Sequence, residues 1–310
     1  MKKILIIRLG AFGDILQAEG AIHDIRNHHP NDQITILTTS PYRKIFERCP
    51  WIDRILIDPR APRHHIFALL RTRKMLRDEH FDIIYDLQNS GRTLMYRAWL
   101  DATWSQKDED YNLEIARRRG RKLAILERIG LQLEQAGISL NHTLKPDVSW
   151  MADNVEDLLT VDQLDKGFIL LNPGSSARHI QKRWPYYSEL AQALMDKGLG
   201  VITAPGPDEI ELCRSLPCPA LFDGGKPLSF FRLAGLLKCA NYVIGNDTGP
   251  MHLAAYLGVR GLALYGSHTS ARATGLDAFL DIIEVSDLSD LKAERVLSHV
   301  LDAIKLPHMP

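Results

Sequence analysis

Residues 241–258 read NYVIGNDTGPMHLAAYLG, and this stretch decides the fold. It opens with an apolar run typical of a buried strand and closes with an apolar run typical of a helix. Between the two lies the polar turn GNDTG, residues 245–249. A helix that begins at such a turn presents unpaired backbone N–H groups and the positive end of its dipole. The turn therefore favours binding of an anion such as a pyrophosphate.

The aspartate in this turn needs a separate role, because a carboxylate repels phosphate. We expect Asp247 to cap the helix and hold the loop, so that Thr248 and Gly249 contact the ligand. His252 lies one turn into the helix, and we interpret it as a packed residue and leave it out of the catalytic set.

The same order of strand, turn and helix recurs along the chain. Amphipathic stretches that predict helices include residues 14–28, 64–79, 185–197, 207–215 and 228–238. The apolar runs that predict strands are KILIIRL (3–9), QITILTT (33–39), RILID (54–58), FDIIYDLQ (81–88), FILLNPG (168–174), GVITAPG (200–206), PALFDGG (219–225), NYVIGND (241–247) and RGLALYG (260–266). Strands separated by helices imply parallel βαβ units, so we predict an α/β protein with two Rossmann-like, doubly wound domains.

The length of 310 residues suits two domains of about 150 residues each. Between the two alternating halves, residues 141–167 lack a strong period and include Pro146. We place the boundary there and predict domains of residues 1–155 and 156–310. The last amphipathic helix, residues 287–304, is expected to pack back on the first domain.

Bulk composition excludes several classes of protein. Basic and acidic residues balance at 38 each, which argues against a general nucleic-acid binder. The four cysteines have no CxxC spacing, so we interpret them as reduced thiols and expect no metal site. The apolar run in MKKILIIRLG is too short for a signal peptide, and no window approaches 18 apolar residues. We therefore expect a cytoplasmic location.

A second turn with chemical potential is RLGAFGDILQ, residues 8–17, after the first strand. Gly10 and Gly13 permit a tight turn, and Asp14 stands at or beside the helix N-cap. The aspartate has two interpretations that can both hold: a stabilising cap, or a carboxylate that accepts a proton from a hydroxyl in an interdomain cleft. The spacing GxxG differs from the GxGxxG of dinucleotide-binding proteins.

Two further loops follow strands of the second half. In LNPGSSARHIQKRWP, residues 171–185, Ser175, Ser176 and Lys182 combine hydroxyl donors with charge, which suits phosphate oxygens; the alternative is a solvated basic loop. In APGPDEIE, residues 204–211, Glu209 suits either a ribose diol or the favourable start of a helix, and the residues leave this open.

The motifs GDIL, KRWP, GPDE and NDTGPMHLAAYLG occur in this order and span nearly the whole chain. Together they resemble glycosyltransferase family 9, whose best-known members are the ADP-heptose:lipopolysaccharide heptosyltransferases. The resemblance implies a GT-B fold, with the acceptor on the first domain and the nucleotide sugar on the second. It also implies an inverting, metal-independent heptosyl transfer from ADP-heptose to a lipopolysaccharide inner-core hydroxyl, with no cofactor besides the donor.

The resemblance also assigns roles to residues. It makes Asp14 the general base, with Gly13 beside the acceptor, and Lys182 the second catalytic residue, which stabilises the departing ADP. The donor-binding set that it implies is Ser175, Ser176, Lys182, Glu209, Leu228, Asp247, Thr248 and Gly249. The chain departs from the family at Gly20, where many members carry proline, and at residues 178–181, which form a longer segment.

The first half is locally basic: residues 60–77 hold five arginines and one lysine without an acid, and RRRGRK follows at 117–122. An anionic glycolipid acceptor suits such a surface, as does peripheral contact with the cytoplasmic face of the inner membrane. The alternative is a solvated helix face. The candidate acceptor contacts are Arg60, Arg63, Arg71, Arg92 and Arg97.

Three other functions remain open from the sequence. The first keeps the chemistry but uses another nucleotide sugar, or a protein or exopolysaccharide acceptor. The second is a nucleotide-sugar epimerase on the same fold, for which no acid/base pair is assigned. The third is a nucleotide-binding regulatory protein without turnover, which would consume no donor.

Overall fold

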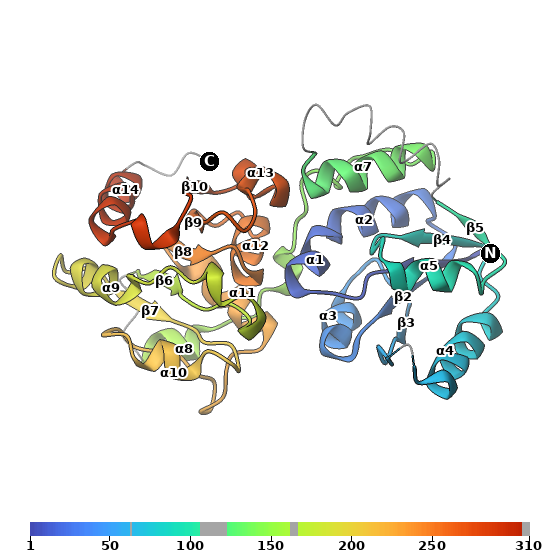
Figure 1. Ribbon diagram of the computed structural model, residues 1–310, viewed down its shortest axis with the longest axis horizontal. Helices are drawn as coiled ribbons and strands as arrows, with labels where there is room; N and C mark the ends of the chain where they lie inside the picture. The colour runs from blue at the N-terminus through green and yellow to red at the C-terminus, as the bar shows by residue number, and fades with distance from the viewer. Residues whose placement is uncertain (63, 106–122, 162–166, 306–310) are drawn as a thin grey trace. The chain divides into compact units, whose positions relative to one another are not determined.

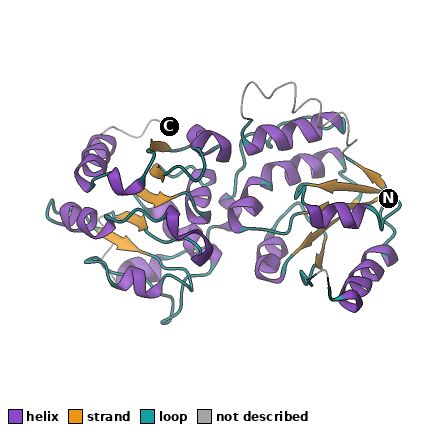
Figure 2. Cartoon of the chain, viewed as in Figure 1, coloured by secondary structure: helices purple, strands orange, loops and turns teal. Residues whose placement is uncertain are grey.

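The computed structural model describes residues 1–62, 64–105, 123–161 and 167–305 (Figure 1). The chain forms two compact units, Met1–Trp150 and Met151–Pro310. The division falls five residues before the expected boundary at 155, within the short 3₁₀ turn Ser149–Met151. In each unit helices alternate with the strands of one parallel sheet (Figure 2).

The first unit is built on a five-stranded parallel sheet in the order β3-β2-β1-β4-β5. Its central strand is completely buried: residues 4–7 have no exposed surface, and Ile4 pairs with Ile34 of β2 and Ile83 of β4. Burial on both faces explains why its sequence is a continuous apolar run. The strands are β1 (Lys3–Ile7), β2 (Gln33–Thr38), β3 (Arg54–Ile57), β4 (Ile83–Asp86) and β5 (Thr103–Trp104).

The predicted helix at 14–28 is two helices, because the chain tightens at Ala18, whose N–H donates to Ile15 O at 3.2 Å. Helices α2 and α7 lie side by side (Figure 1). The carboxylate of Asp24 on α2 accepts hydrogen bonds from the backbone N–H groups of residues 141–143, which anchors the segment that follows α7. The helices are α1 (Phe12–Gln17), α2 (Glu19–His28), α3 (Arg43–Arg48), α4 (Ile66–Asp78), α5 (Gly91–Arg97) and α7 (Ile125–Gln135).

The second unit has its own five-stranded parallel sheet, in the order β10-β9-β8-β6-β7. The predicted strand at 219–225 is wrong: the segment makes only isolated bridges, from Ala220 to Thr203 and from Asp223 to Lys226. Gly224 and Gly225 follow with φ of 54° and 78°, and these left-handed conformations turn the chain back on itself. The strands are β6 (Ile169–Asn172), β7 (Val201–Thr203), β8 (Tyr242–Asn246), β9 (Gly261–Tyr265) and β10 (Asp281–Glu284).

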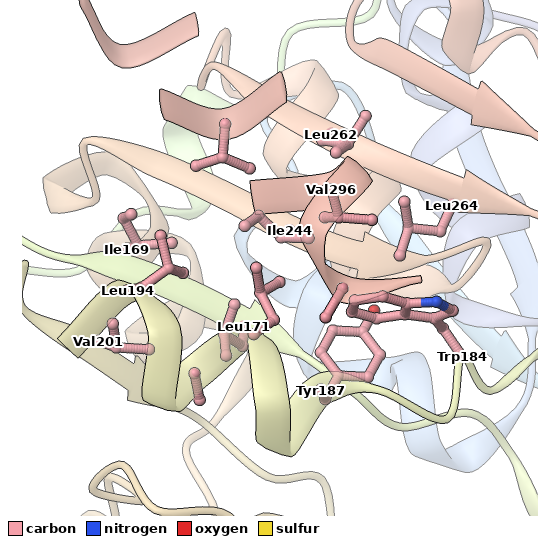
Figure 3. Packing of buried hydrophobic residues seen from close by; sticks show 14 of the residues in the cluster. Ile169, Leu171, Trp184, Tyr187, Leu194, Val201, Ile244, Leu262, Leu264 and Val296 are labelled. Atoms are coloured by element: carbon pink, nitrogen blue, oxygen red, sulfur yellow. The ribbon is translucent and has the colours of Figure 1, made fainter. Parts of the chain in front are cut away.

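The core of the second unit lies between its sheet and helices α9 and α14 (Figure 3). The Trp184 and Tyr187 rings meet edge to face, 5.0 Å apart, at one end of this core. Helix α14 buries Val296 and Val300 in it, so its apolar face is occupied within the second unit, in contrast to the expected packing on the first domain. The helices are α8 (Glu156–Val161), α9 (Tyr187–Met195), α10 (Ile210–Arg214), α11 (Phe230–Cys239), α12 (Gly249–Tyr256), α13 (Ala271–Thr274) and α14 (Ala293–Lys305).

In the parts of the chain that the structure describes, no helix has the length and apolar character needed to cross a membrane.

Candidate functional site

The strand order of the second sheet reverses between β6 and β8, because β7 lies on one side of β6 and β8 on the other. Open α/β sheets bind ligands at the carboxyl ends of the strands beside such a reversal. Two loops meet there: residues 173–183 after β6 and residues 247–249 after β8. We call these two loops the switch-point site.

Asn246, the last residue of β8, holds the two loops together. Its side-chain amide donates to Pro173 O at 2.9 Å and to Gly174 O at 3.1 Å. Its Oδ1 accepts from the Trp184 N–H at 3.1 Å and from the Tyr187 hydroxyl at 3.2 Å. The side chain is completely buried, and every contact joins β8 to the segment after β6. This role cannot be recognised from the sequence, where Asn246 is one polar residue of a turn.

An ion pair joins the two loops at the switch-point site. Lys182 Nζ donates to Asp247 Oδ2 at 2.5 Å and to Asp247 O at 3.2 Å. The Asp247 side chain is 5% exposed and that of Lys182 is 21% exposed, so the lysine is the less buried partner of the pair. Burial raises the pKa of the Asp247 carboxyl, but His252 and Lys182 outweigh burial and hold this pKa well below its usual range. A phosphate would meet Lys182 at its exposed edge while Asp247 holds the ammonium from within.

The inner side of Asp247 meets residues that the sequence analysis left unassigned. The Tyr265 hydroxyl donates to Asp247 Oδ1 at 3.3 Å, and His268 Nε2 lies 3.5 Å from Oδ2. Burial and the charge of Lys182 lower the pKa of His268, which favours a neutral imidazole near pH 7. His252 also approaches, with Nε2 3.8 Å from Oδ1, and is buried as expected of a packed residue. The signal for His268 was its position directly after a buried strand, at the carboxyl end of β9.

Helix α12 begins at the site, as predicted, but the expectation that Asp247 caps it is wrong, because the Asp247 carboxylate binds Lys182. Thr248 is its N-cap, in an extended conformation, and its hydroxyl donates to Asn246 O at 3.2 Å. Gly249 is the first helical residue, and both are half-buried. The positive end of the α12 dipole therefore lies beside Lys182, which binds the adjacent Asp247, and the two attract an anion together.

The two predicted serines have different environments in the structure. Ser175 is buried, its hydroxyl donates to His179 O at 2.9 Å, and it accepts from Arg183 Nε at 3.2 Å. This hydroxyl is therefore engaged inside the loop, and its contact with a phosphate stays a prediction. Ser176 is exposed and keeps the predicted role. Arg183 also donates to Ser175 O at 2.8 Å and so shapes the loop from within.

Glu209 reaches the same edge of the sheet. It is the N-cap of α10, and its Oε2 accepts from the Gly206 N–H at 3.0 Å. A Cβ on Gly174 would lie 1.9 Å from Glu209 Oε1, so the carboxylate is pressed against the backbone of the loop after β6. Glu209 is therefore placed to contact a nucleotide at the switch-point site. Leu228 is half-buried and lies just before Ser229, the N-cap of α11.

In the first unit, Asp14 lies at the carboxyl end of β1, and the turn before it depends on Gly10, whose φ is +113°. The aspartate is the third residue of α1, and its Oδ2 accepts from the Ala11 N–H at 2.8 Å. Buried Arg8 donates to Asp14 O at 2.8 Å and lies 3.6 Å from Oδ1. The carboxylate is 43% exposed. Asp14 thus completes the start of the helix, as the first interpretation required, and its role as a base stays a prediction.

Beside Asp14 lies a cavity of about 410 Å³ at the carboxyl ends of β1, β2 and β3. Gly10, Tyr42, Asp58 and Arg60 are among its lining residues. Burial and the charge of Asp14 raise the pKa of the Tyr42 hydroxyl, which therefore stays protonated at neutral pH. The lining thus combines the Arg60 cation and the Tyr42 ring with the Asp58 carboxylate and several backbone groups.

The predicted acceptor arginines have different environments. Arg60 lines the cavity, and Arg71 is exposed on α4. Arg92 donates to Ala61 O at 2.6 Å and to the Tyr96 hydroxyl at 3.1 Å and lies 3.6 Å from buried Asp58, so its guanidinium is engaged within the first unit, and its contact with the acceptor stays a prediction. Arg97 stacks over the Trp104 ring at 5.6 Å. Arg63 and the basic run at 117–122 lie outside the described residues.

The described residues hold no group of three or more His, Cys, Asp or Glu spaced to bind a metal ion. Positive charge at the switch-point site comes from Lys182 and the start of α12.

Comparisons with known proteins agree with this arrangement. The model of glycosyltransferase family 9 (heptosyltransferase) matches residues 69–299. The chain is 22% identical over 304 residues to the lipopolysaccharide core heptosyltransferase OpsX of Haemophilus influenzae, covering 92% of this chain and 84% of that protein. A family 9 glycosyl transferase from Veillonella parvula has a TM-score of 0.74 at 19% identity, over 98% of this chain and 97% of that one. Escherichia coli heptosyltransferase WaaC, solved with ADP, has a TM-score of 0.72 at 19% identity, over 97% and 99%. The predicted GT-B fold class is thereby confirmed.

Proposed function

The chain belongs to glycosyltransferase family 9, and from that premise we propose that it transfers a heptose from ADP-heptose to a hydroxyl of a lipopolysaccharide inner core. The observation that carries the proposal is the Lys182–Asp247 pair at the start of α12, at the reversal point of the second sheet. The relatives support the choice of substrates, because OpsX is named for lipopolysaccharide core and WaaC was solved with ADP.

The second unit binds the donor in this proposal. The diphosphate lies between Lys182 and the backbone at Thr248 and Gly249, where the ammonium and the helix dipole meet. Glu209 accepts hydrogen bonds from the ribose hydroxyls, and Leu228 packs beside the adenine. Asp247 holds the Lys182 ammonium in place and balances its positive charge before the donor binds.

The first unit binds the acceptor and supplies the base. The acceptor hydroxyl oxygen attacks the anomeric carbon of the heptose, its proton passes to the Asp14 carboxylate, and the bond from that carbon to the phosphate oxygen breaks. The electron pair leaves with ADP, and attack from the opposite face inverts the configuration. A positioned base contributes roughly 10²–10⁴-fold, and one preorganised group at the leaving group contributes about 3–4 kcal/mol.

The direct test incubates the purified protein with ADP-heptose and a panel of truncated lipopolysaccharide cores. ADP release and the mass of the product are measured. We expect stoichiometric ADP release with a gain of one heptose, at a rate that EDTA leaves unchanged. Parallel reactions with UDP- and GDP-sugars, and with protein or exopolysaccharide acceptors, identify the alternative substrates. Donor conversion without an acceptor would indicate an epimerase, and no consumption at all would indicate a binding protein.

The variant D14N separates chemistry from binding. It should lose roughly 10²–10⁴-fold in turnover while it binds ADP with unchanged affinity, because Asp14 belongs to the first unit. The matched control is D101N, which alters an exposed aspartate of the same unit in the segment before β5. An unchanged rate for D14N would remove Asp14 from the mechanism.

A further inference from the structure

Helix α4 exposes an apolar face. Ile66 is 65% exposed, Phe67 is 88% exposed and Leu70 is 50% exposed. These three lie within five residues, although large exposed apolar side chains elsewhere in the described chain occur singly. Exposed apolar residues that occur singly are ordinary in soluble proteins, whereas a contiguous group marks a surface that another molecule covers.

The apolar face is distinct from the face that packs on the first unit. Thr72 and Leu76 are the buried residues of α4, one turn apart on its inner side. Ile66, Phe67 and Leu70 share the opposite side, and Arg71, Lys74 and Arg77 extend the same exposed surface toward the helix end. The outer surface of α4 is therefore apolar in its first half and cationic in its second.

Charge indicates which kind of molecule covers this face. No acidic residue occurs from Pro59 to Arg77, while that span holds six cations. At the start of the helix a hollow of about 430 Å³ is lined by His64, His65, Phe67 and Arg71, among others. An amphipathic helix with aromatic and aliphatic residues beside Lys and Arg binds at the interface of anionic lipids, where acyl chains take the apolar groups and phosphates take the cations.

We propose that the exposed face of α4, centred on Ile66, Phe67 and Leu70 and flanked by Arg71 and Lys74, docks on an anionic phospholipid bilayer. The three apolar side chains enter the region between headgroups and acyl chains, and the two cations pair with lipid phosphates. Docking holds the first unit at the surface that carries a lipid-anchored acceptor. The proposal needs no donor and no turnover, so it stands or falls independently of the proposed function.

The test is sedimentation of the full-length protein with vesicles of phosphatidylethanolamine and phosphatidylglycerol, compared with vesicles of phosphatidylcholine alone. We expect binding to the anionic vesicles only. The double variant I66S/F67S should lower the partition coefficient roughly tenfold or more, because Phe67 alone would bury a large apolar surface in the bilayer. R71Q and K74Q should each lower it roughly fivefold at low salt. The substituted side chains are exposed, so folding is preserved and circular dichroism checks it.

The control variant is L144S, because Leu144 is 48% exposed, close to the 50% of Leu70, and lies in the same unit. L70S should weaken vesicle binding while L144S leaves it unchanged. On a soluble, deacylated core acceptor, I66S/F67S should turn over like the wild type. The proposal is overturned if the wild type does not sediment with anionic vesicles, if I66S/F67S binds them like the wild type, or if L144S is equally impaired. A wild-type dimer that I66S/F67S converts to a monomer would also overturn it, since the face would then contact a second copy of the chain.

Discussion

The pair of Lys182 and Asp247 can be measured by a double-mutant cycle of K182M, D247N and the combined variant. K182M removes the ammonium and leaves a carboxylate that is 5% exposed without its cation. D247N removes the carboxylate and leaves a lysine side chain that is 21% exposed. The two single variants are therefore unequal, and K182M should be the more destabilising.

The expected magnitude follows from the geometry. At the 2.5 Å separation, two unit charges attract by about 6–7 kcal/mol at an effective dielectric constant of about 20. Desolvation of both groups offsets much of this attraction, so we expect a coupling free energy of about 2–3 kcal/mol. K182M alone should cost about 3–5 kcal/mol, as for a buried charge left without its partner. D247N should cost about 1–2 kcal/mol, since the remaining lysine can turn toward water.

Hydrogen exchange followed by mass spectrometry is the appropriate assay, because a chain of two units need not unfold in one step. Peptides from β8 and α12 report the opening free energy around the pair, and peptides from β1 and β4 in the first unit serve as an internal control. ADP titration of the same variants gives a second measurement. K182M should lose ADP affinity, whereas D247N should retain or gain it because a carboxylate beside the diphosphate is removed.

A coupling free energy below about 0.5 kcal/mol would refute this reasoning, because that value is typical of a solvated surface pair. Equal protection of the β8 peptides from hydrogen exchange in K182M and D247N would also contradict the prediction. A low coupling free energy would mean that the short distance reflects contact without net stabilisation, whereas equal protection would contradict only the predicted difference between the two variants.

Three other predictions concern residues around the two sites. The pKa of the Asp247 carboxyl is held below its usual value. Its contribution to the free energy of unfolding should therefore be complete above about pH 5 and decline as the pH falls below the unfolded-state pKa of about 3.9. In D247N this loss of stability at low pH should be smaller, as measured by hydrogen exchange at increasing urea concentrations. N246A should lower the free energy of unfolding of the second unit by about 2–4 kcal/mol and weaken ADP binding, because four buried hydrogen bonds are lost. The control N31A, at an exposed position, should change neither quantity. R92A should lower the thermal stability of the first unit with no change in the acceptor KM, because Arg92 binds Asp58 and Ala61. A raised KM at unchanged stability would instead show that Arg92 contacts the acceptor.

The sequence predicted every strand that is buried on both faces, and the partly exposed edge strand β3 as well. For the buried strands the reason is physical. A central parallel strand such as β1 must be continuously apolar, and this pattern is visible in the sequence alone. The edge strands β5 and β10 are short and partly exposed, with two and four residues, so their sequences carry little apolar signal. The run at 219–225 carried such a signal but bends at Gly224 and Gly225, where positive φ prevents a strand.

At the candidate site, the sequence located the loops but not the contacts between them. Lys182 and Asp247 are 65 residues apart in the chain, so their pairing depends on the adjacency of β6 and β8. The same adjacency makes Asn246 a buried bridge and brings His268 to Asp247 from the end of β9. The contact of the Ser175 hydroxyl with the carbonyl of His179 could not be predicted, because a loop hydroxyl has the same sequence pattern whichever partner it contacts.

Gly20 shows how one departure from the family pattern is fixed by its neighbours. A Cβ at this position would lie 2.2 Å from the carbonyl oxygen of His142, so the two backbones touch where Asp24 anchors residues 141–143. Proline, which many family members carry here, has no room beside that carbonyl. Consensus engineering, which commonly stabilises proteins by restoring the majority residue, should therefore fail at this position: G20P would push the segment before the second unit off α2. Proline could be accommodated at position 20 only if the 141–143 segment were replaced at the same time.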